Sequence, residues 1–124
     1  MRVLVIEERE TVLRALTASL TQAEMGEVLG TTDPLRALDL IRLWQPEAVI
    51  LEVKRRDGLG MQLCRVIRES APQIQLLVVT SYPDPLERLA AMKAGADAYL
   101  MKELDLAELV TRLHIGSSPT NNGG

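Results

Sequence analysis

The chain has 124 residues, of which 47% are hydrophobic and 25% are charged, and its formal net charge at pH 7 is −3. Its size and composition are ordinary for one soluble globular domain, and its apolar runs are too short for a membrane span or a secretion signal. The single cysteine excludes an internal disulfide framework and fits a cytoplasmic location, while the acidic balance and scarce aromatic residues give no footprint for nucleic acid.

The first half of the chain alternates short apolar runs with amphipathic segments. Uninterrupted apolar runs of this length are typical of strands buried on both faces, and apolar residues at helical spacing predict helices that cover them. In order, we predict a strand at 3–6, a helix at about 10–22, an edge strand at 26–31, a helix from Asp33-Pro34 to before Pro46, and a strand at 48–52.

The second half continues the same alternation. Asp84 with Glu87 and Asp105 with Glu108 have the spacing of capping boxes, and Gly95 is a typical helix C-terminus. In order, we predict a basic loop at 53–59, a helix at about 60–70, a strand at 76–79, a helix from 85 to Gly95, a strand at 98–101, a helix from Asp105 to about Ile115, and a disordered tail at 116–124.

Strand and helix therefore alternate five times within one domain, residues 1–115. This pattern predicts an α/β fold with a doubly wound parallel sheet, and the flavodoxin-like (βα)5 order 2-1-3-4-5 is its natural closure. In that order the ligand crevice lies between strands one and three, at the carboxyl ends of the strands.

Polar residues follow the apolar runs at this predicted edge. Three carboxylates close together must bind a cation such as Mg²⁺, pair with an ammonium, or hold a proton. One histidine and one cysteine are too few for a closed zinc site of such ligands. The residues that we expect to meet are Glu7, Glu8, Glu52, Thr80 and Lys102.

Four segments resemble the receiver domains of bacterial two-component response regulators, in order and in spacing: residues 5–8, 48–60, 77–81 and 95–102. The last segment, Gly-Ala-Asp-Ala-Tyr-Leu-Met-Lys, is the most specific, and residues 74–102 are closest to the subfamily that usually carries a helix-turn-helix output domain. The resemblance implies the following roles: Glu52 at the phosphoacceptor position, Glu7 and Glu8 as the acidic pair, Thr80 as the switch hydroxyl, Tyr99 as the switch aromatic and Lys102 as the invariant-type lysine.

The chain departs from the family pattern where the chemistry takes place. The acidic pair and the phosphoacceptor are usually aspartates, and here all three are glutamates. The extra methylene moves each carboxylate by about 1.5 Å, in chemistry that tolerates about 0.5 Å. Arg56 and Glu103 also replace prolines that are usual or frequent in the family.

These departures predict an atypical receiver, or pseudo-receiver. Such a domain would be a signalling module without enzyme activity and without a required cofactor, in which Glu52 points at Thr80 and Lys102 and partly mimics a phosphoryl group. Tyr99 should then pack inward; in an inert site it would face outward or vary. The alternatives are a working receiver phosphorylated on Glu52, with Mg²⁺ held by Glu8 and Glu52, and a metal-dependent phosphohydrolase.

The resemblance also implies partners. A histidine kinase or another signalling protein is expected, and a homodimer could form through residues 85–115. The basic run Lys54-Arg55-Arg56 is interpreted as a solvated loop that could also neutralise the glutamates. The plausible contact residues on the output surface are Leu86, Arg88, Lys93, Asp97 and Arg112.

Overall fold

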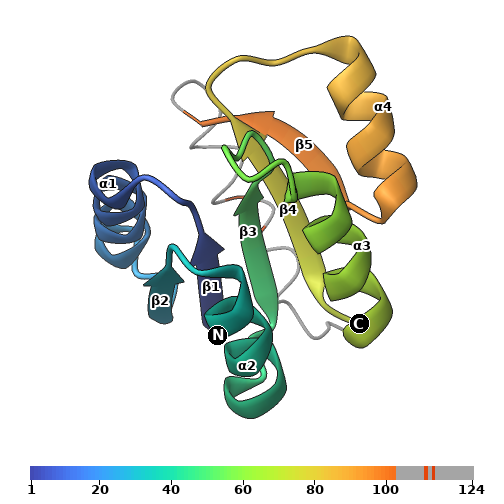
Figure 1. Ribbon diagram of the computed structural model, residues 1–124. Coiled ribbons are helices and arrows are strands. Elements are labelled where there is room, and N and C mark those ends of the chain that lie inside the picture. Colours follow the sequence, from blue (N-terminus) through green and yellow to red (C-terminus); the bar gives the residue numbers. More distant parts are fainter. Residues whose placement is uncertain (103–110, 112, 114–124) are drawn as a thin grey trace.

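The computed structural model describes residues 1–102 together with Thr111 and Leu113 (Figure 1). Within these residues strands and helices alternate along the chain, close to the predicted bounds. The elements are β1 (Arg2–Ile6), α1 (Glu10–Gln22), β2 (Glu27–Thr31), α2 (Pro34–Trp44), β3 (Ala48–Glu52), α3 (Gly60–Ser70), β4 (Gln75–Thr80), α4 (Pro85–Ala94) and β5 (Ala98–Met101).

All strand pairs are parallel, and the sheet order is β2-β1-β3-β4-β5, which confirms the predicted flavodoxin-like topology. β3 lies at the centre, between β1 and β4, and all five of its residues are buried. The register pairs Ile6 with Leu51 and Glu52 with Val79. The residue that follows β1, Glu7, is therefore placed beside the end of β3.

Alternate residues of the strands belong to two separate core layers, because successive side chains of a strand point to opposite faces of the sheet. Helices α2, α3 and α4 cover one face and α1 covers the other (Figure 1). The α2–α4 layer includes Leu4, Ile6, Val49, Leu51, Val78 and Ala91, and the α1 layer includes Val3, Val5, Leu16, Ile50, Val79 and Leu113.

The helix ends follow the predicted signals with one exception. Asp33 and Asp84 cap α2 and α4 by accepting the N–H groups of Leu35 and Leu86, and Gly95 ends α4 with a φ of 116°. The predicted capping box of α4 is only half formed. The Asp84 N–H donates to the Tyr99 hydroxyl rather than to Glu87, whose carboxylate is bonded elsewhere.

The predicted helix at 105–115 and the predicted tail at 116–124 lie outside the described residues, apart from two positions. Thr111 and Leu113 are helical, and Leu113 is fully buried in the α1 layer. Among the residues that the structure describes, no helix has the length and apolar character needed to span a membrane.

Candidate functional site

An ammonium bridges two buried carboxylates at the carboxyl edge of the sheet. The Lys102 Nζ lies 2.5 Å from Glu7 Oε1 and 2.9 Å from Glu52 Oε1. The side chains of Glu7 and Lys102 are 1% and 6% exposed, so this triad is almost fully removed from water. Two of the three predicted carboxylates, Glu7 and Glu52, therefore pair with the Lys102 ammonium.

Strand parity explains why these three side chains meet. Glu7, Glu52 and Lys102 each continue the alternation that sends Val5, Ile50 and Leu100 into the α1 layer. Parallel strands that end at one edge bring such residues side by side. The triad therefore follows from the period of two along β1, β3 and β5.

The second oxygen of each buried carboxylate is also bonded. Glu7 Oε2 accepts the Arg9 N–H at 3.0 Å and lies 3.5 Å from Arg9 Nε. Glu52 Oε2 accepts the Lys54 N–H at 2.8 Å. Burial alone would raise the pKa of Glu7, but the hydrogen bonds and charges of Lys102 and Arg9 outweigh it, and this pKa is lowered from 4.5.

Glu8 lies apart from the triad, at the mouth of an open pocket. Its Oε1 accepts the Arg56 N–H at 2.7 Å. Among the described residues, no three acidic, histidine or cysteine side chains are grouped so that they could hold a metal ion. The pocket has a volume of about 540 Å³ and is lined by Glu8, Arg9, Glu52, Lys54, Arg55, Arg56, Ser81 and Tyr82.

Thr80 is fully buried at the end of β4. Its position in the strand's alternation puts it on the sheet face covered by α2, α3 and α4, opposite to the face of the triad. Its hydroxyl accepts the Tyr82 N–H at 3.1 Å, and its carbonyl accepts the Lys102 N–H at 2.9 Å. The described contacts of the hydroxyl do not include Glu52 or the Lys102 ammonium. The prediction that Glu52 points at both groups is therefore right for Lys102, whereas the described contact of the Thr80 hydroxyl is with the Tyr82 N–H in its own loop.

Tyr99 belongs to the face covered by α4. The ring is partly buried against the α2–α4 layer, so it is neither fully inside nor fully outside. Its hydroxyl donates to Glu87 and accepts the Asp84 N–H at 3.1 Å. Burial and the contact with the Glu87 carboxylate raise the pKa of Tyr99 to about 12.

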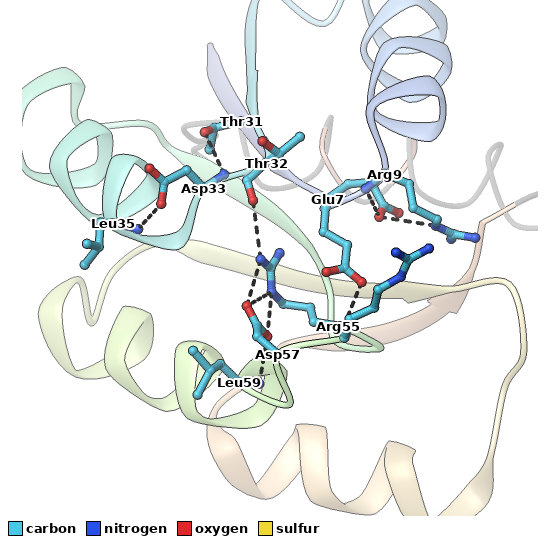
Figure 2. A network of polar contacts seen from close by, with 11 residues as sticks. Glu7, Arg9, Thr31, Thr32, Asp33, Leu35, Arg55, Asp57 and Leu59 are labelled. Atoms are coloured by element: carbon cyan, nitrogen blue, oxygen red, sulfur yellow. Dashed lines mark hydrogen bonds and ion pairs between the residues drawn. The ribbon is translucent and has the colours of Figure 1, made fainter.

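The basic loop is more structured than a solvated run. Figure 2 shows the Arg55 guanidinium between Thr32 and Asp57, and its side chain is only 3% exposed. Arg55 donates to the Thr32 carbonyl at 3.3 Å and pairs with Asp57 at 3.1 Å, which lowers the pKa of Asp57. The solvated interpretation is therefore wrong for Arg55, because its charge is matched within the loop.

Sequence reasoning missed Arg9, and it named Lys54 only as part of a basic run that could neutralise the glutamates. Arg9 follows the acidic pair, and Lys54 binds Glu52 through its backbone N–H and Glu87 through its ammonium. Both backbone contacts join residues two apart, i and i+2, which is a known habit of carboxylates in loops. The ion pair between Lys54 and Glu87 spans 33 positions and leaves no local signal.

Comparison with known proteins gives one family. A family model described as the response regulator receiver domain matches residues 3–114. Response regulator MprA of Mycobacterium sp. (strain KMS) is 35% identical over 113 residues, and that of Mycobacterium avium (strain 104) is 34% identical. Both alignments cover 91% of this chain and 49% of the relative, so the chain spans about half the length of these curated relatives.

Solved structures agree on the fold. A response regulator from Clostridium difficile superposes with a TM-score of 0.86 at 22% identity, covering 98% of this chain and 99% of that one. The BeF3-activated N-terminal receiver domain of Klebsiella pneumoniae RstA gives a TM-score of 0.83 at 24% identity, covering 94% and 97%. A response regulator from Chloroflexus aurantiacus gives 0.81 at 28% identity, covering 93% and 95%.

Proposed function

Because the chain belongs to the family of response regulator receiver domains, we propose that it acts in two-component signalling as a pseudo-receiver. It keeps the scaffold and the interaction surface of a receiver, and Glu52 is a poor acceptor of phosphoryl groups. It works by binding other proteins in the cytoplasm, a histidine kinase among them, and has no enzyme activity of its own.

The observation that carries this proposal is that Glu52 is buried and held by two donors. A phosphoacceptor must present a carboxylate oxygen in line with the donor phosphorus. Both Glu52 oxygens already accept hydrogen bonds, one from the Lys102 ammonium and one from the Lys54 N–H. The Glu52 side chain is also only 2% exposed, so attack on a donor requires the carboxylate to turn away from these partners or the site to open, which raises the barrier.

The donor set also fits Mg²⁺ poorly. This ion needs near-octahedral oxygen ligands, and the ammonium of Lys102 lies between Glu7 and Glu52. Glu8 is bonded to the loop backbone at Arg56 and is not grouped with the other two acids in the described part of the chain. We therefore assign no role to a metal ion in this domain.

The interaction surface is assigned to α4 and β5. Large apolar side chains on α4 are exposed: Leu86 by 77%, Leu89 by 53% and Met92 by 38%. Exposed apolar patches of this kind favour protein contacts, including a second copy of the chain. Asp97 is a weaker candidate than expected, because its carboxylate binds Arg68 and the Leu76 N–H. Arg112 lies outside the described residues.

The test is a phosphorylation assay with acetyl phosphate and Mg²⁺, read by intact-protein mass spectrometry. The wild type should gain no stoichiometric phosphoryl group. The matched variant Glu7→Asp/Glu8→Asp/Glu52→Asp restores the short acids and should gain one, on residue 52. A stoichiometric acyl phosphate on Glu52 of the wild type would refute the proposal.

The alternative of a working receiver has one observation in its favour. Glu52 is among the residues that line the open pocket of about 540 Å³, although its own side chain is only 2% exposed. The same assay decides between the two functions. If the triple variant is folded but gains no phosphoryl group, the length of the three acidic side chains is not the reason why residue 52 is a poor phosphoacceptor.

A further inference from the structure

We propose that Lys54, Glu87 and Tyr99 form a clamp that fixes the first turn of α4 and β5 to the loop beside Glu52. The clamp is a positioning device, and among its members only Lys54 contacts Glu52, through its backbone N–H. It differs from a switch that works through the Thr80 hydroxyl, because its contacts run through the Glu87 carboxylate and not through that hydroxyl.

The contacts form an unbroken series from the pocket to α4. Lys54 Nζ lies 2.7 Å from Glu87 Oε2. The other oxygen, Glu87 Oε1, accepts a short hydrogen bond from the Tyr99 hydroxyl. That hydroxyl in turn accepts the N–H of Asp84, the N-cap of α4, at 3.1 Å. A β-strand, a loop and a helix start are therefore joined at one carboxylate.

The burial of Glu87 makes these contacts stronger than those of ordinary surface pairs. Its side chain is 16% exposed, and that of Lys54 is 37% exposed. A partly desolvated carboxylate held by an ammonium and a phenol is worth more than a solvated pair. The incomplete capping box of α4 has the same origin, because Glu87 turns to Lys54 and Tyr99 instead of the Asp84 N–H.

Lys54 also joins the series to Glu52, two residues before it in the chain. The Lys54 backbone N–H is bonded to Glu52 Oε2, and Lys54 lines the pocket. A change at Glu52 that moves this N–H therefore moves the ammonium relative to Glu87. The state of the pocket is in this way transmitted to Tyr99 and to the exposed apolar surface of α4.

The first test is NMR on the isolated chain. Lys54→Met keeps the length of the side chain and the bond from its N–H to Glu52, but removes the ammonium. We expect the Asp84 amide and the Tyr99 ring resonances to shift by more than the sheet amides of Val49 and Leu77. Glu87→Gln should shift the same resonances, and the double variant should add less than the sum of the two.

Arg56→Met is the matched control. It removes one positive charge from the same loop and keeps the backbone N–H that Glu8 accepts. Its side chain has no ion pair with the residues that the structure describes. It should leave the Asp84 and Tyr99 resonances in place. Equal shifts in this control, or no shift in Lys54→Met, would overturn the clamp.

The second test concerns transmission. In Glu52→Gln a single amide oxygen replaces two carboxylate oxygens, so it cannot serve both Lys102 Nζ and the Lys54 N–H. This change should shift the Tyr99 resonances, and the shift should fall by about half or more when Lys54 is already Met. An undiminished shift would show that the Tyr99 response bypasses Lys54.

The clamp rests on the proposed function only in that α4 is the proposed interaction surface. The NMR tests use no partner, no phosphodonor and no metal ion. Their failure would remove the clamp and leave the phosphorylation result untouched, and the reverse also holds.

Discussion

At the scale of single residues, the site is distinguished by where its charges are compensated. Lys102 pairs with two carboxylates that are nearly absent from the surface, and both carboxylates have backbone donors in addition. Buried ion pairs of this kind add little net stability when complete. Removal of one partner, however, leaves an uncompensated charge in a dry environment.

The first residue-scale prediction concerns Lys102→Met. This variant leaves the buried Glu7 and Glu52 carboxylates without their ammonium partner. We therefore expect the free energy of unfolding to fall by about 3–5 kcal/mol. Urea denaturation followed by circular dichroism measures it. Lys93→Met, on the exposed side of α4, removes the same charge and should change stability by at most about 0.5 kcal/mol. Similar losses in both variants would contradict the buried triad.

Some side-chain contacts of the site can be predicted from the sequence, and others cannot. The meeting of Glu7, Glu52 and Lys102 follows from strand ends and the period of two, both of which can be read along the chain. The burial of Arg55 and the capture of Glu87 by Lys54 cannot be read in this way. They depend on how closely the β3–α3 loop approaches β2 and α4, and this is decided by packing.

At the scale of elements, the β3–α3 connection is the tightest part of the site. Gly60 is the first residue of α3, and a Cβ built there would lie 2.0 Å from the Val53 carbonyl oxygen. The clash is with backbone, so no side-chain rotation can relieve it. The absence of a side chain at this position lets the loop that carries Lys54 fold close to β3.

This packing reverses the usual effect of glycine in a helix. A glycine-to-alanine change commonly stabilises a helix by up to about 1 kcal/mol. Gly60→Ala should instead destabilise the chain by about 2–3 kcal/mol through overpacking, measured by thermal or urea unfolding.

Gly58→Ala is the comparison for Gly60→Ala. Its φ is 72° and no atom lies within 4 Å of the built Cβ, so only backbone strain of about 1–2 kcal/mol is expected. A stabilised Gly60→Ala would show that the loop lies farther from α3 than the structure places it.

The predicted elements themselves were largely correct, because each begins and ends at a strong local signal. Asp33 and Asp84 cap helices, Gly95 takes the left-handed conformation, and β3 is apolar up to Glu52. The error at α4 has a clear physical reason. A capping-box glutamate can bind either the N-cap backbone N–H or partners from elsewhere in the fold. Here Glu87 binds the Lys54 ammonium and the Tyr99 hydroxyl.

At the scale of the whole molecule, the low pKa of Glu7 links the site to stability. A carboxyl whose pKa is lowered by folding contributes stability above its unfolded value, here 4.5, and loses it as the pH falls through the folded value. The unfolded chain takes up the proton first, which favours unfolding in acid.

We therefore expect the free energy of unfolding to decrease as the pH falls from about 5 to about 3, and Glu7→Gln to weaken this dependence. Urea denaturation at several pH values measures both slopes. Glu69→Gln, at an exposed position near the end of α3, serves as the control and should keep the wild-type slope. Identical slopes for Glu7→Gln and the wild type would show that Glu7 is not linked to acid unfolding.

Topology was the best predicted property at this scale. Five alternations of strand and helix leave few ways to close a parallel sheet, and the observed order is the expected one. The family likeness follows from the same pattern. The balance of charges around the pocket could not be predicted, because it is set by contacts between segments far apart in the sequence.

The ammonium of Lys102 is a permanent part of the chain, so the compensation that it provides needs no donor, ion or enzyme. In the proposed pseudo-receiver, the domain would carry one setting from the moment it folds, and no chemical mark would have to be removed to reset it. The strength of its signal would then depend on how many copies are present. Synthesis and degradation, rather than a reversible chemical mark, would be the steps at which a cell adjusts it.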